Sequence, residues 1–386
     1  MPSIYLDHNA TTPLLPQARM AMAEALEGTW GNPSSVHAAG RAARDLVESA
    51  RRDVALLLGA LPEEIVFTSG GTEGDNLAIR GLALAGRRRR GGGPAHVVAS
   101  PLEHPAVQGA LDELAAQGFT VTRLPVGPHG EIAVADVGAA LRDDTVVVSL
   151  ALANHEIGNV YDVRAFAAAA HAAGALFHTD AVQAAGRMAI DVHALGADAA
   201  TISAHKLGGP KGAGALYVRR GVDLDPLICG GHQERERRAG TENVPGIAGF
   251  GAACRLTREE LPIRSPRLAA LRDRLERRLL AIAGARLHGA VTGRVPGTIN
   301  VSFDGAEGQL VMVGLDLEGV CVSTGAACAS GTLAPSPVLL AMGVSPTVAR
   351  EAVRFSVGRG NGEDEVERAA ALVERVVARV RAAAVA

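Results

Sequence analysis

The chain has 386 residues, of which 48% are hydrophobic and 20% are charged, and its formal net charge is -3. A chain of this length can form two domains with a substantial core, and its nearly balanced charge argues against nucleic acid or another polyanion as a partner. Because no run of 18 uncharged apolar residues occurs and the start MPSIYLDHNATTP has no basic and then apolar leader, we expect no membrane association and a cytoplasmic location.

Seven apolar, β-branched runs alternate with alanine-rich segments of helical periodicity. The runs cover residues 63–69, 95–100, 120–126, 145–154, 175–180, 198–204 and 214–218. Short buried strands separated by helices indicate βαβ units. We therefore predict an α/β fold whose large domain has a mostly parallel seven-stranded sheet covered by helices.

The pattern changes after about residue 250. A long charged helix is expected over residues 265–284, followed by mixed elements that include the strand-like GTINVSFDG. This change predicts a smaller α+β domain. We assign residues 14–250 to the large domain, and residues 1–13 and 251–386 to the small one.

Polar residues gather where the predicted strands end, which is where open parallel sheets bind ligands. The glycine-rich turn TSGGTEGDN follows the first strand, and its backbone N–H groups at a helix start suit either a phosphate or ordinary helix capping. Asp180 ends an apolar strand, where a carboxylate needs a partner such as a pyridinium N–H or a helix N-terminus.

Lys206 follows the next strand end, and the only other lysine is Lys211 in a Gly/Pro turn. Lysine can become a neutral nucleophile, whereas arginine stays protonated. Lys206 is therefore a candidate for a Schiff base with the aldehyde of pyridoxal phosphate (PLP), with Asp180 at the ring nitrogen. Ser203 and His205 flank the lysine as phosphate ligands, and His104 is the candidate to stack on the ring.

Nine motifs in this order resemble the cysteine desulfurases, PLP enzymes of fold type I (class V aminotransferase-like) that supply sulfur for iron–sulfur clusters. The resemblance covers residue 5 to about residue 360. The motifs are YLDHNATTP, TSGGTEGDNLAI, EHPAV, NHEIGN, TDAVQAAG, DAATISAHKLGGPKGAGALYV, GGHQERERRAGTENVPGIAG, VSTGAACASG and VRFSVGR.

The resemblance implies a role for each matching residue. Lys206 would hold PLP, Asp180 the ring nitrogen and Gln183 the phenolic oxygen, while His104 would stack on the ring. The phosphate would be held by Gly71, Thr72, Ser203 and His205, with Thr241 reaching the site of the neighbouring subunit of a homodimer. Asn154 and Arg354 would bind the carboxylate of L-cysteine, with Asn32 nearby; a planar guanidinium also suits a carboxylate on its own chemistry.

Cys328 matches the catalytic cysteine of the family. Its surroundings, TGAACASGTLAPS, are poor in anchoring apolar residues, which is typical of a loop that can carry a nucleophile to a site. Cys321 lies in an alternating apolar strand, where cysteine usually acts as a small hydrophobe, and Cys229 and Cys254 look similarly structural. The four cysteines lack CxxC or CxxH spacing, so neither disulfides nor a metal is expected.

The predicted activity is conversion of L-cysteine to L-alanine, leaving a persulfide on Cys328 for a sulfur-acceptor or iron–sulfur scaffold protein. A selenocysteine lyase or an aminotransferase on the same fold remains an alternative, as does a non-catalytic subunit that binds a sulfur carrier. Such a subunit would be expected to lose Lys206, Asp180 or Cys328, and all three are present. The chain departs from the family in GAACAS, in His155 where a second Asn is common, and in a plain helical tail, which leaves the acceptor open.

Overall fold

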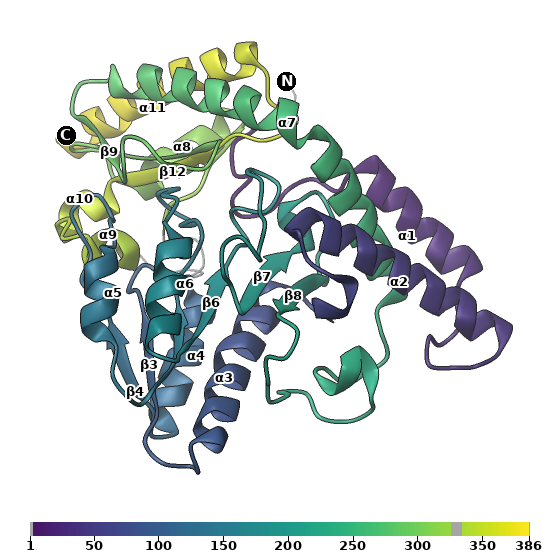
Figure 1. The fold of residues 1–386 in the computed structure, drawn as a ribbon. Coiled ribbons are helices and arrows are strands. Elements are labelled where there is room, and N and C mark those ends of the chain that lie inside the picture. The colour runs from purple at the N-terminus through teal and green to yellow at the C-terminus, as the bar shows by residue number, and fades with distance from the viewer. Residues whose placement is uncertain (1–2, 326–333, 386) are drawn as a thin grey trace.

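The computed structural model describes residues 3–325 and 334–385, and its main feature is a seven-stranded sheet in the order β2-β8-β7-β6-β5-β3-β4 (Figure 1). Its strands are β2 (Ile65–Thr68), β3 (His96–Ala99), β4 (Thr120–Arg123), β5 (Thr145–Ser149), β6 (Leu176–Asp180), β7 (Ala199–Ser203) and β8 (Gly214–Val218). β8 runs antiparallel to both of its neighbours, and the other paired strands are parallel. The predicted α/β fold with a mostly parallel sheet is confirmed.

Helices cover both faces of this sheet because successive side chains of a strand point to opposite faces. Val97 and Val147 pack with the helices α3 and α4, whereas Val98 and Val148 belong to the core on the other face with Phe166 of α6. The covering helices are α3 (Gly71–Arg89), α4 (Pro105–Ala116), α5 (Val134–Ala140) and α6 (Val163–Ala172). Burial on both faces explains the apolar, β-branched run of β5, whereas the edge strand β4 is partly exposed and mostly polar.

One predicted strand was too long. β5 ends at Ser149 rather than at Asn154. The Asn154 side chain holds the turn that follows, because its Oδ1 accepts the N–H groups of Glu156 and Ile157 at 2.8 and 3.0 Å. An apolar run gives no sign of such a turn, so the pattern alone could not place the strand end.

A second core surrounds a three-stranded antiparallel sheet in the order β12-β10-β9. Its strands are β9 (Ala285–His288), β10 (Thr298–Phe303) and β12 (Ala352–Ser356), and beside them β1 (Ile4–Tyr5) pairs in parallel with β11 (Val320–Cys321). The nearby helices are α8 (Gly308–Leu317), α9 (Pro337–Ala341), α10 (Pro346–Arg350) and α11 (Glu363–Val385).

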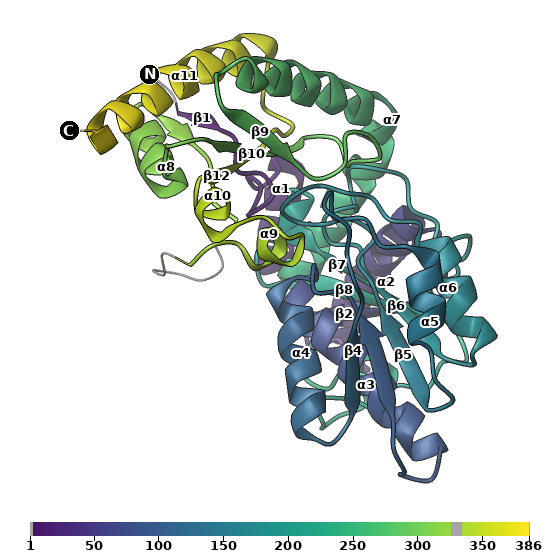
Figure 2. The same cartoon turned by 90° about the vertical axis from the view of Figure 1, so that its left-hand side faces the viewer.

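The helix α7 (Val244–Leu280) connects the two cores and begins earlier than the predicted residue 265. It packs on α1 (Pro16–Gly28) and α2 (Ala38–Leu58), and also on β9, β10 and α11 (Figure 2). Residue 250 lies inside this continuous helix, so the domain boundaries at residues 14 and 250 stay a prediction. Within the part of the chain that the structure describes, no helix combines the length and apolar character needed to cross a membrane.

Candidate active site

Asp180 and Lys206 come from neighbouring strands of the main sheet. β6 ends at Asp180, whose register partner on β7 is Thr201, and β7 leads into the short helix η2 (Ala204–Lys206). Asp180 Oδ1 accepts the N–H of Val182 at 2.8 Å. Burial raises the pKa of Asp180, while that N–H and the positive charges of His155 and Lys206 act in the opposite direction. A buried carboxylate placed in this way favours a cationic N–H as its partner.

The ammonium group of Lys206 lies against the N-terminal segment. Nζ donates to the carbonyl oxygen of Ala10 at 2.8 Å and to that of Asn9. The neighbouring His205 is tied to the same segment, because Thr12 Oγ1 donates to the His205 carbonyl at 2.7 Å. Residues 9–12 therefore hold His205 and Lys206 at the end of η2. The motif YLDHNATTP, which contains residues 9–12, had supplied no predicted site residue.

His104 is the N-cap of α4, and its Nδ1 accepts the N–H of Ala106 at 3.1 Å. Burial lowers the pKa of His104 to about 3, with the charges of His155, Lys206 and Arg354 adding to the effect. The ring is therefore neutral at pH 7, with its proton on Nε2 because Nδ1 accepts a hydrogen bond. The ring of His155 lies 5.1 Å away in an edge-on arrangement.

Two buried polar atoms near these residues have no hydrogen-bond partner in the described part of the chain: Gln183 Oε1 and Ser203 Oγ. Ser203 also approaches the start of α3, where a Cβ on Gly71 would lie 3.6 Å from Ser203 Cβ. Buried polar atoms need partners, and a phosphate at a helix N-terminus would supply one to Ser203. With Asp180 and Lys206, this donor set fits PLP, whose aldehyde, ring nitrogen, phenolic oxygen and phosphate each find a matching group.

Arg354 lies on β12 of the three-stranded sheet, whereas Lys206 follows β7 of the seven-stranded sheet. Its guanidinium donates to Asp7 Oδ1 at 3.0 Å and to the carbonyl of His155 at 3.1 Å, and its buried Nε has no hydrogen bond within the described chain. Asn154 is engaged in its own turn and also donates from Nδ2 to the carbonyl of Leu102 at 2.9 Å. Arg354 and Asn154, the two residues predicted to bind the substrate carboxylate, thus differ, since only Arg354 has a charged side chain.

Three predicted residues are not brought into this group. Asn32 and Thr241 are exposed on the single chain, and Asn32 Oδ1 accepts the N–H of Ser34 at 2.9 Å. Thr241 lines a separate cavity of about 240 Å³ together with Ser69. Cys328 lies outside the described residues.

Sequence reasoning missed two buried carboxylates beneath the site, Asp75 and Glu103. Burial raises both pKa values well above their ordinary range, and the charge of Asp180 raises them further. Burial and the neighbouring charge of Asp180 therefore favour the protonated form of both groups. The quoted motifs TSGGTEGDNLAI and EHPAV contain these residues, but nothing in a sequence pattern marks a carboxylate as buried.

Comparison with known proteins identifies the class. A model of the aminotransferase class-V family matches residues 4–369, and the chain belongs to this family. A protein of Trichormus azollae named cysteine desulfurase is 44% identical over 383 residues, which cover 99% of this chain and 94% of the relative.

Solved structures give the same result. A structure titled NifS-like protein is similar with a TM-score of 0.91 and 34% identity, covering 98% of this chain and 100% of that one. A structure titled SspA in complex with cysteine has a TM-score of 0.81 and 32% identity, covering 92% and 99% of the two chains. The resemblance drawn from the nine motifs is thereby confirmed.

Proposed function

We propose that this chain is a PLP-dependent cysteine desulfurase that converts L-cysteine to L-alanine and supplies sulfur for iron–sulfur cluster assembly. The observation that carries the proposal is the meeting, at adjoining strand ends, of Lys206, buried Asp180 and two atoms without a partner among the described residues, Gln183 Oε1 and Ser203 Oγ. The relatives named cysteine desulfurase and the related structure titled as a complex with cysteine support the substrate.

When bound, PLP supplies an electron sink at the substrate Cα. Lys206 would hold the cofactor through its amine, and the same amine would be placed to move a proton at Cα. Asp180 would accept the N–H of the cofactor ring, and the neutral His104 would contact that ring. Ser203, His205, Gly71 and Thr72 would hold the phosphate.

Arg354 binds the substrate carboxylate as a planar, bidentate donor. Its existing hydrogen bond to Asp7, 3.0 Å long, orients the guanidinium and offsets its charge before substrate binds. Asn154 and Asn32 complete the carboxylate site in this proposal. Because the Asn154 side chain is already hydrogen-bonded to the backbone of the turn that it stabilises, Arg354 makes the larger contribution to substrate binding.

Cys328 receives the sulfur. Its thiolate attacks the substrate sulfur, so that an S–S bond forms, the C–S bond breaks and its electron pair stays with the substrate carbon. Protonation of that carbon completes L-alanine, and Cys328 is left as a persulfide, so the step needs no outside oxidant. A thiol of an acceptor or scaffold protein then takes the outer sulfur.

The working form is a homodimer in the cytoplasm. The exposure of Thr241 and Asn32 on one chain supports a dimer in which a second copy completes each site. Trp30 and Val36, 80% and 88% exposed, lie beside Asn32 and provide apolar surface for that contact. A compartment that keeps thiols reduced suits a persulfide carrier.

The test is to incubate the purified holoprotein with L-cysteine and to measure alanine and sulfide together in the presence of a thiol. Equal amounts of the two products are expected. A parallel reaction with selenocysteine in place of L-cysteine tests the alternative of a selenocysteine lyase, which would act faster on selenocysteine. Transfer of the amino group to a 2-oxo acid without sulfide release would instead identify an aminotransferase and refute the proposal.

A further inference from the structure

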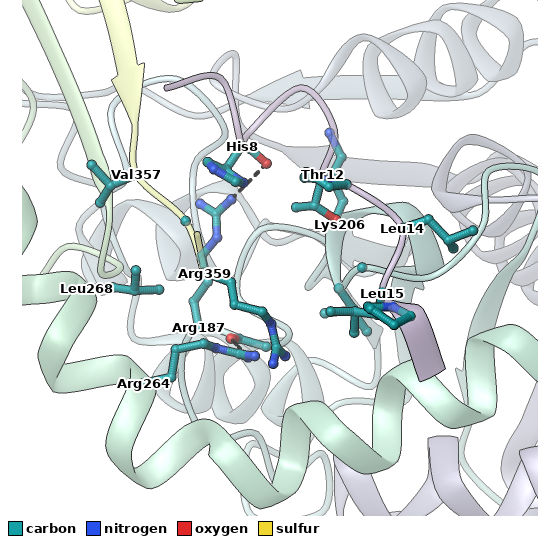
Figure 3. Close-up of a pocket in the computed structure, with 16 residues that line it drawn as sticks. His8, Thr12, Leu14, Leu15, Arg187, Lys206, Arg264, Leu268, Val357 and Arg359 are labelled. Atoms are coloured by element: carbon teal, nitrogen blue, oxygen red, sulfur yellow. Dashed lines mark hydrogen bonds between the residues drawn. The ribbon is translucent and has the colours of Figure 1, made fainter. Parts of the chain in front are cut away.

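A cavity of about 260 Å³ lies between the N-terminal segment, α7 and the residues that follow β12 (Figure 3). Among the predicted active-site residues, only Lys206 lines it. Three arginines reach it from separate parts of the chain: Arg187 from the loop after β6, Arg264 from α7 and Arg359 from the loop after β12. The cavity is therefore distinct from the predicted site of the substrate carboxylate at Arg354.

Positive charge exceeds negative charge around this cavity. Arg187 is 8% exposed, and its guanidinium donates only to neutral oxygens, Thr298 Oγ1 at 3.2 Å and the His8 carbonyl at 3.4 Å. Within the described chain it forms no ion pair. Arg264 and Arg359 share one carboxylate, Glu260, and the buried Nη2 of Arg359 has no hydrogen bond there.

The pKa values agree with an excess of buried charge. Burial, followed by the charges of Arg354 and Arg264, lowers the pKa of Arg187 to about 9. Burial, followed by the charge of Arg359, lowers the pKa of Arg264 to about 10, against the opposing effect of Glu260. The facing His8 has its pKa lowered to about 4, mainly by burial, and is neutral at pH 7.

Apart from Lys206, His8 and Thr12, the remaining side chains of the wall are apolar. Leu14, Leu15, Leu268 and Val357 line it, and no carboxylate of the described residues does so. Guanidinium groups suit carboxylates because their paired N–H donors match two oxygens. An apolar wall favours a hydrocarbon body over a fully hydrated inorganic ion.

We propose that this cavity binds a small aliphatic carboxylate, with its charged head on Arg187, Arg264 and Arg359 and its hydrocarbon chain against the leucine wall. Such a ligand would contact residues attached to both sheets, because Arg187 lies in the loop after β6 and Arg359 in the loop after β12. Ligands that bind only the folded state stabilise it. Binding should therefore raise the thermal midpoint of the protein.

The probe is pentanoate, added to the holoprotein at pH 7 and followed by calorimetric titration and thermal unfolding. Pentan-1-ol tests the need for charge, and inorganic phosphate tests the need for the hydrocarbon chain. Pentanoate should bind and raise the midpoint, while pentan-1-ol has no effect and phosphate binds more weakly. Phosphate binding as tightly as pentanoate, or no binding of either, would overturn the proposal.

Variants locate the bound probe. Arg264→Gln and Arg359→Gln should each weaken pentanoate binding about tenfold or more, equivalent to about 1.4 kcal/mol. Arg277→Gln is the matched control, since Arg277 is exposed on the same helix. Arg187→Met provides a second test, because removing an unpaired buried charge should not prevent folding, and it should also weaken binding.

Arg354→Gln separates the two sites for carboxylates. If pentanoate occupies the cavity, this variant binds it as the unchanged protein does. Binding that is lost in Arg354→Gln and kept in Arg264→Gln and Arg187→Met would place the probe at the substrate site and refute the cavity proposal.

Discussion

Lys206 is the residue on which the proposed chemistry depends, because a primary amine is needed to bind PLP covalently. Its ammonium group is positioned by the carbonyls of Ala10 and Asn9. These carbonyls can hold an amine before the cofactor arrives. A guanidinium could donate to the same carbonyls, but it stays protonated and cannot bond covalently to the aldehyde.

Lys206→Ala should lower sulfide and alanine formation by at least about 10²-fold, the scale of a lost acid–base group, and should remove the absorbance of covalently bound PLP. Lys206→Arg should not restore either, since the guanidinium stays protonated. Lys211→Arg, at an exposed position, is the control and should keep both. Full activity in Lys206→Ala would exclude the PLP assignment.

The choice of Cys328 as the sulfur carrier can be tested against the other three cysteines. Burial raises the pKa of Cys321, with Asp316 and Asp7 adding to the effect, and burial raises the pKa of Cys254 well above its usual range. Both are therefore poor thiolates at pH 7.

Cys328→Ala should keep the bound cofactor and lose sulfide release, and mass spectrometry of the unchanged protein after reaction with cysteine should find the added sulfur on the peptide that contains Cys328. The alanine variants of Cys229, Cys254 and Cys321 should stay active. Sulfide release by Cys328→Ala at the normal rate would show that another cysteine carries the sulfur.

At the scale of elements, His178 joins three neighbouring strands of the main sheet. It lies on β6, and its ring nitrogens are hydrogen-bonded to Ser149 Oγ on β5 at 2.9 Å and to Thr201 Oγ1 on β7 at 3.0 Å. Burial lowers its pKa to about 3. The folded state keeps this ring neutral, whereas the unfolded state takes up a proton below about pH 6.5.

The stabilising contribution of neutral His178 is complete above pH 6.5 and is lost as the pH falls toward 3. His178→Asn should therefore reduce the slope of unfolding free energy against pH by about 1.4 kcal/mol per pH unit between pH 4 and 6. The slope of unfolding free energy against pH must be compared between the unchanged protein and the variant. Asp75 and Glu103, whose pKa values are raised, contribute a slope of opposite sign to both proteins. A slope in His178→Asn equal to that of the unchanged protein would contradict the prediction.

At the scale of the whole molecule, the segment before Thr241 is held in a strained form. Glu234, Arg235 and Glu236 have φ angles of 46°, 56° and 65°, a region that costs non-glycine residues about 1–3 kcal/mol each. Buried Glu234 accepts both Nη groups of Arg51, at 2.8 and 2.7 Å, and the N–H of Phe67 at 2.8 Å. This pair fixes the start of the segment, and Arg235, Glu236 and Thr241 after it are exposed.

Sedimentation should show a homodimer at micromolar concentration. Thr241→Ala should weaken PLP retention by about tenfold, because a hydrogen bond to the charged phosphate is lost. Thr120→Ala, at an exposed position on β4, is the control for loss of a threonine hydroxyl. A monomer with full activity would contradict the dimer and the role of Thr241 together.

Lys206 and Asp180 could be found from the sequence because both follow apolar runs, and the ends of parallel strands meet at one edge of a sheet. The same pattern predicted the main sheet, since period and residue type are local properties. Those local signals failed at residues 150–154, where the apolar run continues although β5 has ended at Ser149.

Only the tertiary structure decided which distant residues meet. Ile4 pairs with Val320, and Arg354 reaches Asp7, although hundreds of residues separate the partners. The raised pKa of Asp75 and the lowered pKa of Arg187 depend on burial by those distant segments. The sequence by itself therefore determined the chemistry available at the strand ends, because that chemistry belongs to single residues. Protonation, charge balance and the cavity of arginines were decided by folding, because desolvation depends on what surrounds a group in space.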